Sequence, residues 1–112
     1  MNDTAATLSD CKALVEAFVE ERDWQPYHRP NQLAMSLVSE ATEVLELFLW
    51  RGDEPTAEVT DDPQLLAELR DELADVFMNV LSLSNRLDID LAAALKAKMV
   101  RNADKYPPPS GD

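Results

Sequence analysis

The chain has 112 residues, enough for one domain with a single core and too few for two. Hydrophobic residues make up 46% of the sequence, which excludes a disordered chain, and no apolar run approaches the roughly 18 residues of a membrane span. The net charge of −12 disfavours nucleic-acid duplexes and anionic membranes as partners, because both need clustered cations.

The first ten residues, MNDTAATLSD, are polar and acidic and do not resemble a secretory signal. Cys11 is the single cysteine, so no internal disulfide can form. Both features fit a protein of the reducing cytoplasm, which is the expected location.

Apolar positions follow the helical period, and prolines stand at the edges of the periodic segments. Four helices are expected, at about residues 7–24, 30–50, 63–86 and 91–106. Thr7 or Ser9 and Asp90 are the expected N-caps of the first and fourth helices, and the third is expected to open around Asp62 and Pro63. The pattern predicts an all-α four-helix bundle forming one domain over residues 1–112, with a Pro-rich tail at 107–112.

The second and third helices each carry an apolar stripe that is expected to face the core. On the second helix the stripe comprises Leu37, Ala41, Val44, Leu45 and Phe48; on the third it comprises Leu66, Leu69, Leu73, Val76, Phe77 and Val80. The second helix is apolar outside its stripe as well, at Met35, Leu47, Leu49 and Trp50. A helix that is apolar on more than one side needs a second partner, so a homo-oligomer, a dimer or a tetramer, is expected.

Acidic residues lie on these two helices where counter-charges are absent. Glu40 and Glu43 lie in a stretch with no basic residue between Arg29 and Arg51. On the third helix, Glu72 and Asp75 repeat the same three-residue spacing. Because residues three apart share a helix side, antiparallel neighbours would bring the two pairs face to face.

Four carboxylates that converge in this way require protons or a cation. Magnesium takes oxygen ligands and commonly bridges carboxylates and substrate phosphates, so a Mg²⁺ site is predicted, with Mn²⁺ able to substitute. Solvated acidic faces would account for the same spacing in an acidic protein. A di-iron bundle is disfavoured because it needs histidine ligands on two helices, and His28 is the only histidine.

The last helix carries a basic face. Lys98, Arg101, Asn102 and Lys105 recur at helical spacing, followed by Tyr106. Such a face can hold phosphate oxygens through charge-assisted hydrogen bonds, although a solvated basic face has the same pattern.

Aromatic residues gather before the second helix, at Trp24, Tyr27 and His28, and Trp50 lies near its far end. Their rings can stack on a nucleobase. A tryptophan that closes the end of the bundle is the alternative.

Together these segments resemble the MazG-like superfamily of all-α nucleoside triphosphate pyrophosphatases, closest to its dCTP pyrophosphatase branch. The resemblance covers about residues 21–107 and rests on four motifs in the family's order: "ERDWQPYHRP", "SEATEVLELFLW", "DELADV" and "KMVRNADKYP". The family's acidic signature corresponds to Glu40 and Glu43 followed, after 28 residues, by Glu72 and Asp75.

The resemblance implies roles for individual residues. Glu40, Glu43, Glu72 and Asp75 would bind Mg²⁺, with Glu43 also orienting the attacking water. The base would lie among Trp24, His28 and Trp50. The phosphates would be held from the last helix by Lys98, Asn102, Lys105 and Tyr106. Arg101, which shares the basic face of that helix, is a further candidate for substrate binding.

The implied reaction is hydrolysis of a deoxynucleoside triphosphate, dCTP or a modified dCTP, to the monophosphate and pyrophosphate, in nucleotide-pool sanitation. Two alternatives remain open. One is the same chemistry on another nucleotide, such as dUTP, an oxidised dNTP or phosphoribosyl-ATP. The other is a non-enzymatic helical interaction module that uses the tryptophans as anchors.

Overall fold

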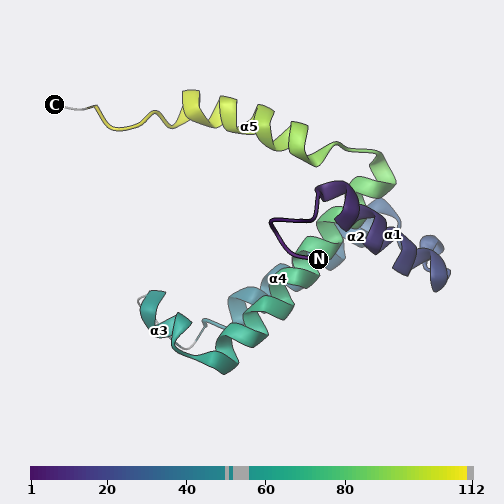
Figure 1. The fold of residues 1–112 in the computed structure, drawn as a ribbon, viewed down its shortest axis with the longest axis horizontal. Helices are drawn as coiled ribbons and strands as arrows, with labels where there is room; N and C mark the ends of the chain where they lie inside the picture. Colours follow the sequence, from purple (N-terminus) through teal and green to yellow (C-terminus); the bar gives the residue numbers. More distant parts are fainter. Residues whose placement is uncertain (50, 52–55, 111–112) are drawn as a thin grey trace.

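A computed structural model describes residues 1–49, 51 and 56–110. Every regular element in this part of the chain is helical (Figure 1). The elements are α1 (Leu8–Glu21), a 3₁₀ turn η1 (Gln25–Tyr27), α2 (Pro30–Glu46), α3 (Thr56–Thr60), α4 (Pro63–Leu87) and α5 (Leu91–Lys105). The described residues thus hold five α-helices where four were predicted, because α3 lies in a segment expected to be a loop. In addition, α2 ends before its predicted end near residue 50.

No helix in the described part of the chain combines the length and apolar character needed to cross a membrane.

Side-chain caps begin three of the helices, and those at Thr7 and Asp90 were predicted. Thr7 accepts a hydrogen bond from the Asp10 amide, and the Asp10 carboxylate accepts one from the Thr7 amide. Asp62 accepts from the Leu65 amide at the start of α4, and Asp90 accepts from the Ala93 amide at the start of α5. Each cap satisfies a backbone donor that the helix leaves unpaired, which stabilises a helix by about 1 kcal/mol.

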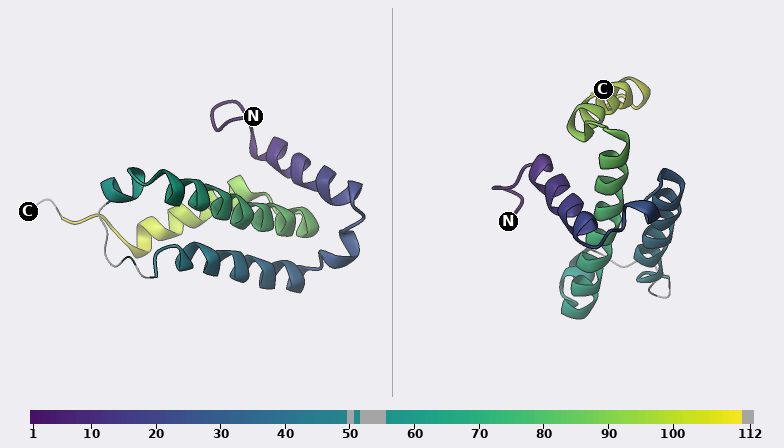
Figure 2. Two further views of the ribbon diagram at one scale, coloured as in Figure 1. Left: turned by 90° about the horizontal axis from the view of Figure 1, so that it is seen from below. Right: turned by 90° about the vertical axis from the view of Figure 1, so that its right-hand side faces the viewer.

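The long helix α4 lies between α1 and α2, which run along its opposite sides (Figure 2). Helices α2 and α4 are antiparallel, as predicted for consecutive bundle helices. The buried apolar residues among those described are Val19, Leu33, Leu65 and Leu81. Helix α1 is tied to α4 by an ion pair of 3.3 Å between Arg86 and Glu16, and by a hydrogen bond from Asn85 to the Lys12 carbonyl.

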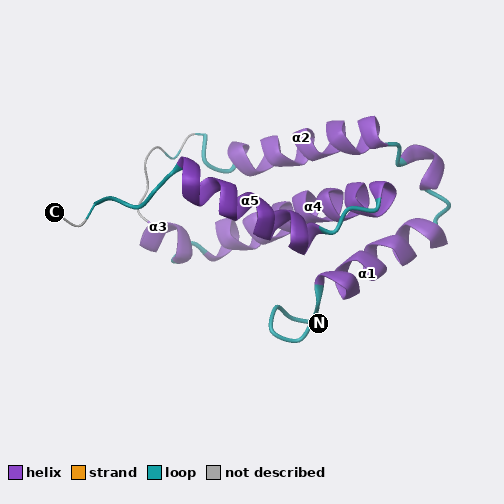
Figure 3. Ribbon diagram, turned by 90° about the horizontal axis from the view of Figure 1, so that it is seen from above, coloured by secondary structure: helices purple, strands orange, loops and turns teal. Residues whose placement is uncertain are grey.

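Helix α5 leaves the layer instead of completing a bundle (Figures 1 and 3). Asp88, in the left-handed conformation with φ of 55°, ends α4 and allows the chain to turn. Two residues of α5 are half-buried, Leu91 near the turn and Asn102 near the far end. All other residues of α5 are exposed. The prediction that the last helix packs within a four-helix bundle is therefore wrong for a single chain.

Large apolar side chains on α2 and α4 remain exposed on one side of the layer, which we call the apolar face. At 100° per residue, they lie about 80–140° round their helices, in the same sense, from the buried Leu33 of α2 and the buried Leu65 of α4. Because α2 and α4 are antiparallel, the same sense of rotation carries both sets to the same side. The apolar face comprises Val38 (66% exposed), Leu45 (59%), Leu73 (51%) and Phe77 (41%).

The apolar face changes two expectations. Leu45, Leu73 and Phe77 were expected in the core, and that prediction is wrong for an isolated chain. The expected surplus of apolar surface on the second helix is present, since Met35 is 62% exposed and Leu49, just beyond α2, is 53% exposed. Trp50, which belongs to the same expectation, lies outside the described residues.

The Asp62 cap gives a test of the local stability of α4. Asp62→Ala removes the acceptor for the Leu65 amide and should lower the free energy of unfolding by about 1 kcal/mol. Asp62→Asn keeps a capping oxygen but loses the ion pair with Arg51, which is worth less, so its effect should be smaller. Asp61→Ala is the control for removal of a neighbouring charge. Equal losses for Asp61→Ala and Asp62→Ala in urea unfolding would contradict the capping role.

Candidate active site

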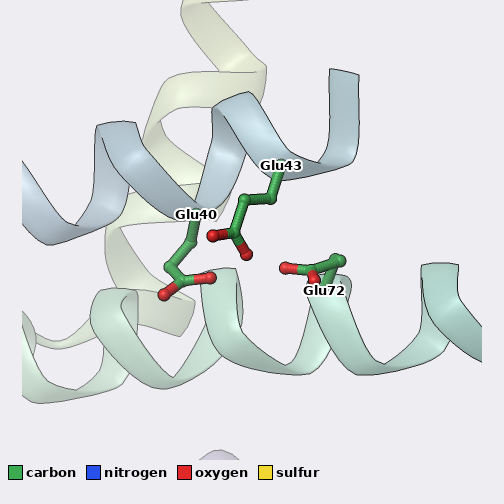
Figure 4. A group of neighbouring side chains, drawn as sticks. All are labelled: Glu40, Glu43 and Glu72. Atoms are coloured by element: carbon green, nitrogen blue, oxygen red, sulfur yellow. The ribbon is translucent and has the colours of Figure 1, made fainter. Parts of the chain in front are cut away.

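Three carboxylates converge between α2 and α4. Glu40 and Glu43 extend from α2, and Glu72 extends towards them from α4 (Figure 4). One oxygen atom of each residue lies within 4.8 Å of the corresponding oxygens of the other two. The three-residue spacing on α2 and the antiparallel packing of α4 therefore place these residues as the sequence predicted. We call Glu40, Glu43 and Glu72 the acidic trio.

The acidic trio has no counter-charge from the rest of the described chain. The ion pairs among the described residues join Arg22 to Glu21, Arg51 to Asp62 and Arg86 to Glu16. Two trio atoms, Oε2 of Glu40 and Oε2 of Glu72, are buried and receive no hydrogen bond. Buried carboxylate oxygens without partners are unfavourable, so this site demands either protons or a cation.

The pKa values of the trio reflect this crowding. The pKa of Glu72 is raised to about 7, first by the adjacent Glu43 carboxylate, with which it would share a proton, and then by burial and by the charges of Glu43, Glu40 and Asp75. The pKa of Glu40 is raised first by burial and then by the charge of Glu43. A divalent cation would remove the need for these protons by neutralising the charge directly.

Asp75, the fourth predicted ligand, lies beside the acidic trio and not within it. It follows Glu72 by one helical turn and is half-buried. Its charge contributes to the raised pKa of Glu40 and of Glu72, so it belongs to the same electrostatic environment. Oxygen-only donors of this kind suit hard divalent cations, and the trio is able to hold one.

A mostly apolar pocket of about 450 Å³ opens one helical turn from the carboxylates. Ser36, which precedes Glu40 by one turn on α2, and Asn79, which follows Asp75 by one turn on α4, lie on the side of the pocket nearest the acidic residues. The lining comprises Trp24, Tyr27, His28, Gln32, Leu33, Ser36, Met78 and Asn79. Pocket and carboxylates thus lie side by side between α2 and α4.

The aromatic residues of the pocket come from the segment between α1 and α2. Trp24 packs edge-to-face on Phe18, with ring centroids 5.4 Å apart, and lies 6.1 Å from the His28 ring. Because Trp24 is 39% exposed, it does not simply close the bundle end. Burial, followed by the charge of Arg86, lowers the pKa of His28 and so favours its neutral imidazole.

Of the three aromatic residues predicted to surround a base, Trp24 and His28 share this pocket, and Trp50 lies outside the described residues. Sequence reasoning did not identify Gln32, Met78 and Asn79 as pocket residues. The available signal was positional, because Asn79 continues the acidic strip of α4 by one further turn.

The basic residues of α5 do not reach the acidic trio in this chain. Lys98, Arg101 and Lys105 are exposed and make no ion pair within the described residues. Asn102 is half-buried and donates to the sulfur of Met99 at 3.7 Å, while the Lys105 ammonium lies 5.3 Å from the centre of the Tyr106 ring. The expected approach of this face to the carboxylates is therefore not made within a single chain.

Known proteins resemble this chain in both sequence and fold. Residues 35–112 match the MazG-like family. Over 101 residues the chain is 38% identical to dCTP pyrophosphatase 1 of Bos taurus and of Homo sapiens, covering 90% of this chain and 60% and 59% of those proteins. The chain thus spans about 60% of the length of these curated relatives.

The fold resembles a crystal structure of a pyrophosphatase from Archaeoglobus fulgidus. The TM-score is 0.78 at 29% sequence identity, and the match covers 96% of this chain and 99% of that chain. A protein described as a pyrophosphatase therefore has a similar arrangement of helices.

The raised pKa of Glu72 predicts a pH effect on stability without divalent ions. Because its pKa is about 7 in the folded chain and 4.5 ordinarily, the folded state binds this proton more tightly. The resulting stabilisation is complete below about pH 4.5 and is lost as the pH rises through about 7. In EDTA, the melting temperature of the wild type should therefore fall between pH 5 and 8 more than that of Glu72→Gln. Identical pH profiles for the two proteins would contradict the prediction.

Proposed function

The chain belongs to the MazG-like family, and from that premise we propose that it is a Mg²⁺-dependent nucleoside triphosphate pyrophosphohydrolase. The reaction converts a deoxynucleoside triphosphate, with dCTP or a modified dCTP as the preferred substrate, and water into the monophosphate and pyrophosphate. The observation that carries the proposal is the acidic trio, which lacks counter-charges and lies beside an aromatic pocket. The similarity to dCTP pyrophosphatase 1 supports the choice of base.

Glu40, Glu43, Glu72 and Asp75 are the proposed Mg²⁺ ligands. The first three already present oxygen atoms within 4.8 Å of one another, and Asp75 is near enough to influence two of them. A bound Mg²⁺ supplies positive charge that offsets the charge of the phosphate oxygens and of the leaving pyrophosphate. Mn²⁺, which accepts the same oxygen ligands, would substitute for it.

The residues of the chain supply orientation. Glu43 lies between Glu40 and Glu72 in Figure 4 and is exposed at its helix surface, where its carboxylate can accept a hydrogen bond from the attacking water. Trp24 and the neutral His28 present ring faces on which a base can stack. The water then attacks the α-phosphorus while the base is held about one helical turn away.

The phosphate-binding residues come, in this proposal, from a second copy of the chain. Lys98, Arg101, Asn102, Lys105 and Tyr106 lie on a helix that projects from the layer and leaves the acidic trio of its own chain unneutralised. The exposed apolar face of α2 and α4 gives a second copy a surface to cover. We therefore propose a homodimer or homotetramer whose sites combine acidic and basic residues from different copies, with Trp50 completing the base pocket.

A role in nucleotide-pool sanitation in the cytoplasm follows from this activity. The half-buried free thiol of Cys11 is compatible with a reducing compartment. Nucleic acid and membranes are not expected partners, because the net charge of −12 repels both.

An assay of dCTP, dTTP, dATP, dGTP and dUTP with and without Mg²⁺ tests the activity. The wild type should release pyrophosphate, and not orthophosphate, from dCTP only when a divalent ion is present. Glu43→Gln and Glu72→Gln should reduce kcat by at least about 100-fold, because each removes a charged oxygen ligand. Glu46→Gln, which changes an exposed glutamate one turn further along α2, is the matched control and should retain activity.

Release of orthophosphate, or full activity of Glu43→Gln with Mg²⁺, would contradict the proposed mechanism. Absence of hydrolysis of every nucleotide would favour the interaction-module alternative.

Mixing two inactive variants tests whether sites are shared between copies. Glu43→Gln disables the acidic side, and the double variant Lys98→Ala/Lys105→Ala disables the basic side. Random exchange between two dimers should restore about a quarter of wild-type activity, because half of the dimers are mixed and each of these has one intact site. Absence of recovery, with mixed dimers confirmed by two affinity tags, would place all site residues within one chain.

A further inference from the structure

We propose that Asn79 determines the base preference of this protein by accepting a hydrogen bond from an exocyclic amino group, such as the 4-amino group of cytosine. The inference rests on the proposed function for the identity of the pocket as a base site. Beyond that function, the inference names Asn79 as the residue that distinguishes a pyrimidine with an amino group from one that carries oxygen or hydrogen at the same ring position.

Asn79 is the most deeply buried polar residue of the pocket. Only 3% of its surface is exposed, and it lies on α4 among a lining that is mostly apolar. An amide in such surroundings is unfavourable unless its polar atoms find partners. Asn79 satisfies one of them within the chain, because Nδ2 donates to the backbone carbonyl of Asp75 at 3.0 Å.

That hydrogen bond fixes which way the amide faces. A backbone carbonyl can only accept, so the amide atom beside the Asp75 oxygen must be the nitrogen. The Asn79 oxygen Oδ1 therefore occupies the other branch of the side chain. It receives no hydrogen bond within the described residues, and it is not among the enclosed unpartnered atoms of the chain. Asn79 thus presents Oδ1 to the pocket as an acceptor without a partner, while one of the two Nδ2 hydrogens is held by the Asp75 carbonyl.

The acceptor has a direct consequence for selectivity. A cytosine 4-amino group donates to Oδ1 and so gives the acceptor of Asn79 the partner that it lacks within the chain. A uracil or thymine ring in the same position places an oxygen against Oδ1, so two acceptors meet and the buried amide oxygen stays unpaired. A site built to pair with a polar group rejects a ligand that lacks it more strongly than a purely apolar pocket does.

Gln32 helps to orient the ring in the same sense. Its Oε1 accepts from the Arg29 amide at 3.3 Å, which leaves Nε2 as a donor at the edge of the pocket. Cytosine carries acceptors at N3 and O2 beside its 4-amino group. The acceptor of Asn79 and the donor of Gln32 therefore match the two kinds of group on one edge of cytosine.

The experiment measures equilibrium binding of monophosphates to the full-length protein by calorimetry, so that it does not depend on turnover. The ligands are dCMP, dUMP and the 2-pyrimidinone deoxynucleotide, which keeps N3 and O2 and has hydrogen in place of the 4-amino group. The wild type should bind dCMP about tenfold more tightly than either of the others. Asn79→Leu, which has similar volume and no acceptor, should bind all three within about threefold of one another.

Ser82→Ala is the matched control. Ser82 is also 3% exposed, lies one turn further along α4 and does not line the pocket. It should leave the ratio of dissociation constants unchanged. Asn79→Ala provides a second variant should the leucine perturb packing, and thermal unfolding checks that each variant is folded.

An unchanged ratio of dCMP to 2-pyrimidinone affinity in both Asn79 variants would overturn the inference. So would equal binding of the three ligands by the wild type, or no measurable binding of any. The proposed function is judged separately by pyrophosphate release. If dCTP is hydrolysed while the ratios do not respond to Asn79, only the inference about selectivity fails.

Discussion

Repulsion among carboxylates in the seam between α2 and α4 is the constraint on which the rest of this structure depends. Leu33 of α2 and Leu65 of α4 are buried, yet the seam between these helices holds oxygen atoms of Glu40, Glu43 and Glu72 within 4.8 Å of one another. Crowding of this kind is unfavourable for folding, since it leaves two carboxylate oxygens buried without partners. A marginally stable fold can keep these crowded carboxylates because the site needs to bind positive charge for its chemistry.

The same constraint explains why the chain is incomplete alone. The acidic trio lies in the seam between α2 and α4, and the apolar face of Val38, Leu45, Leu73 and Phe77 stays exposed. Helix α5 contributes basic residues but contacts neither the trio nor a core of its own. An assembly that covers the apolar face and brings α5 to the acidic side of another copy would satisfy both needs at once, which is why the proposed activity and the proposed oligomer belong together.

Features set by local spacing could be predicted from the sequence. The caps at Thr7, Asp62 and Asp90 depend on a few neighbouring residues, and the trio depends on a three-residue repeat on two antiparallel helices. The resemblance of short motifs to one family supplied the remaining site residues as expectations.

Features set by long-range packing could not be predicted in this way. Helical periodicity identifies an apolar stripe without naming the surface that covers it, so Leu45, Leu73 and Phe77 were assigned to a core that one chain does not form. The short helix α3 has too few residues to show a period. Asn79 was not predicted as a pocket residue because most of the residues that line the pocket with it lie between α1 and α2 and on α2, far away in sequence.

The most direct test of the central claim is the binding of Mn²⁺, used as a paramagnetic substitute for Mg²⁺, measured by electron paramagnetic resonance. In the presence of a non-hydrolysable dCTP analogue, the wild type should bind at least one ion per chain with saturation, and Glu40→Gln/Glu72→Gln should lose that binding while staying folded. Saturable binding of equal strength in the double variant, or none in the wild type, would contradict the account.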